Sequence, residues 1–147
     1  MKTLHSIWRD SRIITAELAV LTPMDLHKDN RYLTRDLPAI EKNGLWYPLL
    51  VYRITLDWWD NKFAKYKSPD CFYVDPVIAD DGFIWAVKMG SNRYQSARDL
   101  GYTVIDIIMC DDVNECVKLG KWFAQCNPLN NINSLPYLGL FDYEHLL

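Results

Sequence analysis

The apolar run VIDIIM at residues 104–109 constrains the fold more than any other stretch of the sequence. An apolar run of this length predicts a strand, and a run with so little polar interruption is typical of a strand in the middle of a sheet. Further strands are predicted at residues 83–89, at residues 48–54 and at residues 17–21. In the second of these, Pro48 can only open the strand, because proline donates no hydrogen bond to a sheet.

Three helices are predicted around these strands. The first follows Asp36 as its N-cap, and the second covers residues 92–100 with Ser91 as its cap. The third begins at Asp112, where Glu115 completes a capping box three residues later. The resulting order of strands and helices predicts an α+β fold, in which a small mixed β-sheet is flanked by helices.

The chain has 147 residues, which suits one domain covering residues 1–147. The hydrophobic pattern breaks at about residues 56–81, and we interpret this segment as an insertion between two core strands. The segment at about residues 128–147 is rich in Asn, Leu and Tyr, and we interpret it as a C-terminal tail. It docks either on the core or on a second copy of the chain.

Composition and charge exclude several classes of function. The chain has sixteen basic and nineteen acidic residues, for a net charge of −3. This net charge removes the simplest argument for binding DNA or an anionic membrane. No apolar run reaches the roughly 18 residues of a membrane helix, and the N-terminus lacks the features of a signal peptide. No two of the four cysteines have the two-residue gap of a zinc site, so no metal site is predicted. We expect a cytoplasmic, reduced location.

The segment Gly90-Ser91-Asn92-Arg93 holds the ingredients of a phosphate site. The N-terminus of a helix carries unpaired N–H groups and a partial positive charge, and a glycine there lets a ligand approach the backbone. A serine hydroxyl and an arginine fork can reach the same place. The alternative is a capped helix with a solvated arginine, which the four residues alone leave open.

Two segments, in this order, resemble the ParB N-terminal domain and sulfiredoxin superfamily. The first runs from Val20 to Val51 and includes Gly44 and the run PLLV, as in the first box of that superfamily. The second, GSNRYQSARDLGY at residues 90–102, resembles its glycine-x-x-arginine box. The resemblance implies a fold that binds a nucleotide, CTP or ATP with magnesium, through its phosphates.

By position, the resemblance implies that six residues contact phosphate. They are Gly90, Ser91, Asn92, Arg93, Arg31 and Arg35. The two arginines of the first box could equally form a solvated polar surface.

The departures from the superfamily limit what chemistry is expected. Sulfiredoxin-like enzymes carry a catalytic cysteine where this chain has Ser91, so their repair chemistry is rejected here. Kinase-like relatives carry a glutamate base at the same position, and Glu41 is the candidate to replace it. Only residues 110–147 follow the second box and its strand, which leaves no room for the DNA-binding and dimerisation domains of full-length ParB proteins. DNA binding by this chain alone is therefore not expected.

Two rival functions follow from the same sequence. One is an enzyme, a phosphotransferase or nucleotide hydrolase, and whether the chain is an enzyme is left open. The other is a protein-interaction module that uses the aromatic insertion to bind a protein partner. Its candidate residues are Trp58, Trp59, Phe63 and Tyr66.

Overall fold

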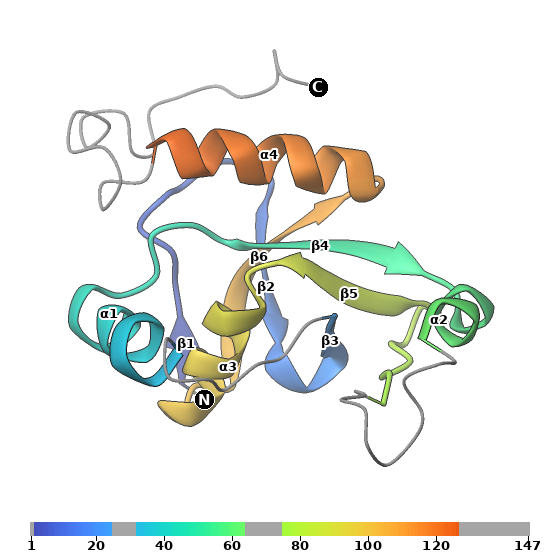
Figure 1. Cartoon of the computed structure of the whole chain (residues 1–147), viewed down its shortest axis with the longest axis horizontal. Coiled ribbons are helices and arrows are strands. Elements are labelled where there is room, and N and C mark those ends of the chain that lie inside the picture. The colour runs from blue at the N-terminus through green and yellow to red at the C-terminus, as the bar shows by residue number, and fades with distance from the viewer. Residues whose placement is uncertain (1, 25–31, 64–74, 127–147) are drawn as a thin grey trace.

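The computed structural model describes residues 2–24, 32–63 and 75–126, and these form an α+β fold built on a curled, mixed six-stranded sheet (Figure 1). The strands are β1 (Thr3–Leu4), β2 (Ile13–Glu17), β3 (Leu21–Pro23), β4 (Leu49–Ile54), β5 (Ile84–Met89) and β6 (Val104–Cys110). The α-helices are α1 (Leu37–Asn43), α2 (Leu56–Phe63), α3 (Ser91–Asp99) and α4 (Val113–Cys126). A short 3-10 helix, η1 (Leu18–Val20), joins β2 to β3, and a π-helical turn, η2 (Tyr32–Asp36), leads into α1.

Strand β6 lies at the centre of the sheet, as its apolar sequence predicts. Along one edge it pairs antiparallel with β2, from Val104 to Ile108. Along its other edge it pairs parallel with β1 at its start and with β4 from Ile107 onward. Strand β5 then pairs antiparallel with β4, and β3 pairs parallel with β5. The sheet is therefore mixed.

Two hydrophobic clusters cover the two faces of the sheet. Successive side chains of a strand point to opposite faces, so Ile108 and Cys110 of β6 join one cluster while Ile105 and Ile107 join the other. Helix α4 packs on the first face, and α3 packs on the second (Figure 1). Helices α1 and α2 lie at opposite ends of the molecule (Figure 1).

The close packing of α4 against the sheet explains why a glycine, Gly120, occurs in the middle of this helix. A Cβ at Gly120 would lie 2.7 Å from Cε of Met89, which is in β5. The absence of a side chain lets the helix approach the sheet. The start of α4 matches the predicted capping box in part. The backbone N–H of Glu115 donates to Oδ1 of Asp112 at 2.9 Å, whereas the carboxylate of Glu115 accepts a hydrogen bond at 3.3 Å from the N–H of Asp111, the residue before the cap.

Most of the predicted elements are confirmed, and one predicted strand is wrong. Residues 17–21 do not form one strand, because η1 interrupts the chain between β2 and β3. Asp36 holds the predicted N-cap position of α1, but its backbone is already helical because η2 continues directly into α1, and its side chain makes no capping hydrogen bond. The insertion begins with a regular helix, α2.

The hydrophobic pattern also failed to predict the two strands at the N-terminus, β1 and β2. The predicted C-terminal tail lies outside the described residues. Among the helices that the structure describes, none has the length and apolar character needed to cross a membrane.

Candidate phosphate-binding site

The turn that leads from β5 into α3 depends on a glycine. Gly90 has a φ of 114°, in the left-handed region that side chains disfavour. A Cβ at this position would lie 2.6 Å from Cδ2 of Leu49 and 2.8 Å from Nη2 of Arg93. Gly90, and not Ser91, is the N-cap of α3, and no side chain caps the helix. The expected capping role of Ser91 is therefore wrong, and Ser91 is the first residue of the helix.

Arg93 connects the two segments that the sequence singles out. Its Nη1 donates a hydrogen bond to the carbonyl of Tyr47 at 2.9 Å and a longer one to the carbonyl of Pro48 at 3.4 Å. Both carbonyls lie just before β4, so the arginine ties the beginning of α3 to the strand beside it. The guanidinium folds back beneath Gly90.

The charge of Arg93 is poorly compensated. Burial lowers the pKa of its guanidinium from 12.5 to about 10, because a charged group loses hydration when it leaves water. Its partners in the described part of the chain are backbone carbonyls, and no carboxylate there forms an ion pair with it. At neutral pH the arginine is still a cation, and an anion placed next to it would restore part of the lost stabilisation.

Asp36, in the first box, contacts a residue of the second box. Its Oδ2 accepts a hydrogen bond from the side-chain amide of Asn92 at 2.8 Å, and its Oδ1 pairs with Nε of Arg35 at 2.9 Å. Two of the residues expected to contact phosphate therefore share one carboxylate. The sequence pattern predicted a capping role for Asp36 and not a place in the site. The one signal for that place was its position directly after Arg35.

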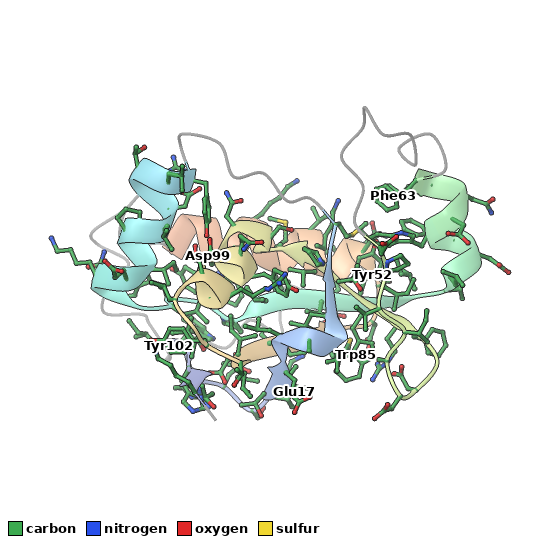
Figure 2. All side chains as sticks on the ribbon, turned by 90° about the horizontal axis from the view of Figure 1, so that it is seen from below. Glu17, Tyr52, Phe63, Trp85, Asp99 and Tyr102 are labelled. Atoms are coloured by element: carbon green, nitrogen blue, oxygen red, sulfur yellow. The ribbon has the colours of Figure 1, made fainter. Side chains whose placement is uncertain are left out.

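The turn before α1 is anchored to α3 by a buried tyrosine. The hydroxyl of Tyr32 donates to Oδ2 of Asp99 at 2.6 Å, and the side-chain amide of Gln95 donates to Oδ1 of the same carboxylate at 2.9 Å. Burial, and then the hydrogen bond to Asp99, raise the pKa of Tyr32 from 10.0 to about 12. Figure 2 shows Asp99 on α3, at the same end of the molecule as Tyr102.

The structure thus brings most of the expected phosphate contacts to one place. Gly90 and the first turn of α3 form its centre, and Arg35 approaches from the turn before α1 through Asp36. Arg31 lies outside the described residues. Glu41 is exposed on α1, and no hydrogen bond or ion pair links it to the rest of the described chain. Asp36, not Glu41, is the carboxylate that contacts the second box.

The aromatic insertion is divided between the core and the surface. Trp59 is only 1% exposed and packs against Phe63, with a distance of 4.4 Å between the ring centroids. Trp58 is 39% exposed, and Nζ of Lys62 lies 4.9 Å from the centroid of its ring. The expected partner surface is corrected accordingly, because Trp59 belongs to the core and leaves Trp58 as the exposed tryptophan. Tyr66 lies outside the described residues.

Asp81, Cys110 and Cys116 have structural partners. Asp81 accepts a hydrogen bond from Nε of Arg53 at 2.7 Å, which lowers the pKa of its carboxyl group. Cys110 and Cys116 are buried free thiols, and the hydrogen bond between them, together with burial, raises the pKa of Cys110. In the residues that the structure describes, no group of three or more His, Cys, Asp or Glu could hold a metal ion.

Comparisons with protein-family models and with curated proteins found no match to this chain. The likeness to the ParB and sulfiredoxin superfamily therefore rests on the two segments of sequence. The arrangement around them can bind an anion: a helix N-terminus without a side-chain cap, an arginine without a carboxylate partner in the described chain, and two further donors held by one displaceable carboxylate.

Proposed function

We propose that the chain binds a nucleotide through its phosphate groups at the beginning of α3. The observation that carries this proposal is the state of Arg93, a half-buried cation in the first turn of a helix whose described partners are backbone carbonyls. A phosphate at this position would interact with the guanidinium and with the positive end of the helix at once.

The surroundings of Arg93 support the same proposal. Gly90 presents bare backbone at the entrance to the helix, and the N–H groups of the first turn have no side-chain cap. Asn92 and Arg35 add two hydrogen-bond donors within reach of the site, both held by Asp36. The resemblance to the ParB and sulfiredoxin superfamily favours CTP or ATP with magnesium as the ligand, in a binding protein whose location is cytoplasmic.

A second candidate is phosphoryl transfer or nucleotide hydrolysis at the same site. It is favoured by the position of Asp36, whose carboxylate contacts Asn92 and could accept a proton from an attacking hydroxyl or water. This candidate predicts turnover that depends on magnesium and is lost in Asp36→Asn. Pure binding predicts that Asp36→Asn retains the ligand and that no product forms.

The binding proposal is tested by thermal unfolding with CTP, ATP, GTP and ADP, each with and without magnesium. A ligand that binds only the folded chain, at about a hundred times its dissociation constant, adds roughly 2.7 kcal/mol to the free energy of unfolding. We expect one nucleotide to raise the midpoint of wild type and of Arg98→Ala, and to leave Arg93→Ala unchanged from its own baseline. Arg98 is the matched control, because it is an exposed arginine in the last turn of the same helix.

A further inference from the structure

A second group of reactive side chains surrounds Asp106, on the face of the sheet opposite α3. Asp106 is in the central strand β6 and is completely buried, which is costly for a carboxyl group unless hydrogen bonds compensate. Its partners come from the segment after β1. The backbone N–H of Ser6 donates to Oδ2 at 2.8 Å, and the guanidinium of Arg9 donates to the same oxygen.

His5 occupies the other oxygen of this carboxylate. Its Nδ1 lies 3.1 Å from Oδ1 of Asp106, while 60% of its side chain is exposed. Because the carboxylate is an acceptor for Ser6 and Arg9, the hydrogen between His5 and Asp106 belongs on Nδ1. In neutral His5 the lone pair is then on Nε2, which has no hydrogen-bond partner in the described chain.

Arg9 contacts the same carboxylate through its other oxygen. Its guanidinium and the His5 ring both contact the one carboxylate, and 56% of the arginine side chain is exposed. The group thus combines an oriented imidazole whose Nε2 has no described partner, a buried carboxylate behind the ring, and a partly exposed cation on the same carboxylate. This is the arrangement that activates a nucleophile towards an anionic electrophile.

We propose that Nε2 of His5 accepts a phosphoryl group from a small phosphoryl donor, with Asp106 as its positioning residue and Arg9 as the contact for the phosphoryl oxygens. The proposal goes beyond nucleotide binding and does not depend on it. The lone pair of Nε2 forms a bond to phosphorus, and the bond between phosphorus and the leaving group breaks. With phosphoramidate as donor, ammonia leaves with that electron pair. The positive charge that develops on the ring is stabilised by Asp106 through Nδ1–H.

The test is labelling of the full chain with potassium phosphoramidate at neutral pH, followed by mass spectrometry that locates the added phosphoryl group. The chain supplies two internal controls, His27 and His145, which lie outside the described residues. We expect His5 to be labelled faster than both. Labelling of His5 at the same rate as the controls, or more slowly, overturns the proposal.

Two variants separate the roles of the neighbours. In Asp106→Asn the labelling of His5 is expected to slow roughly 10- to 100-fold, the size of effect seen when metal-binding histidines lose an orienting partner. If that variant does not fold, Arg9→Gln tests the proposal, because Arg9 is more than half exposed and its replacement should leave the fold intact. It should slow the reaction of His5 with phosphoramidate but not its reaction with the uncharged reagent diethyl pyrocarbonate. An unchanged rate with phosphoramidate, or equal slowing with both reagents, contradicts the assigned role of Arg9.

Discussion

Nη1 of Arg93 lies 2.9 Å from the carbonyl oxygen of Tyr47, and this hydrogen bond joins the beginning of α3 to the chain that enters β4. The two partners are 46 positions apart in the chain, so the bond connects the two segments that resemble the superfamily. Its acceptor is a neutral carbonyl, which leaves the charge of the arginine uncompensated by any described carboxylate. The bond therefore fixes the guanidinium in place without consuming its charge, as an anion-binding site requires.

Replacement of Gly90 by alanine is expected to destabilise the fold by two additive effects. A non-glycine residue in the left-handed region costs about 1–2 kcal/mol, and the new Cβ would also collide with Leu49 and Arg93. Gly101→Ala is the matched control, since Gly101 has a φ of 85° and a Cβ added there would meet no atom within 4 Å. Urea denaturation should show a larger loss for Gly90→Ala than for Gly101→Ala. Equal losses would show that the space beneath Gly90 is not restricted.

Removal of the negative charge of Asp36 is expected to strengthen the binding of the phosphate ligand. Asp36 occupies donors of Asn92 and Arg35, and its charge repels an incoming anion. Asp36→Asn should therefore lower the Kd by at least about fivefold, because two unit charges about 4 Å apart interact by about 1 kcal/mol even at the dielectric of water. Asp57→Asn on α2 makes the same change of charge at the other end of the molecule and should leave the Kd unchanged. A weaker affinity in Asp36→Asn would contradict this prediction and would mean that Asp36 helps to bind the ligand.

Tyr32 is expected to make the stability of the protein sensitive to alkaline pH. Its pKa is about 12 in the folded chain and 10.0 without the fold, so the folded state holds the phenol proton more tightly. The corresponding stability, about 2–3 kcal/mol, is fully present below pH 10 and is lost as the pH rises towards 12. Urea denaturation from pH 8 to pH 12 should show a smaller decline for Tyr32→Phe than for wild type. Parallel curves would contradict the burial of this hydroxyl.

The two neighbouring tryptophans of α2 are expected to behave differently. Trp59→Ala removes a fully buried ring from the core and should cost about 3–5 kcal/mol. Trp58→Ala removes an exposed ring and should change the stability by no more than about 0.5 kcal/mol. The same measurement of unfolding by urea compares them. Should the chain act through a protein partner, Trp58→Ala is the variant that weakens binding while the fold stays intact.

Local sequence pattern was enough to predict β4, β5, β6 and the helices α3 and α4, because the strands are apolar runs and the helices are marked by an apolar face or by residues typical of helix ends. The local pattern did not predict the elements that form only through contacts with distant parts of the chain. Strands β1 and β2 are short and stable only as neighbours of β6, and their sequences mix polar and apolar residues without a clear period.

The candidate site shows the same division. The sequence singled out Gly90 and Arg93, because a tolerance for positive φ and a charge are properties of single residues, and their contact with phosphate stays a prediction. The carboxylate of Asp36 was missed because the hydrogen bond to Asn92 spans 56 residues. The contacts of Asp106 were missed for the same reason, because its partners His5 and Arg9 lie about a hundred residues away in the chain.

Isothermal titration calorimetry of the purified chain with CTP and ATP, in the presence of magnesium, tests the central claim most directly. We expect saturable binding of a nucleotide to wild type and to Arg98→Ala, and no measurable heat of binding to Arg93→Ala. Absence of binding to wild type, or the same affinity in Arg93→Ala, would contradict the assignment of the Gly90–Arg93 segment as a phosphate site.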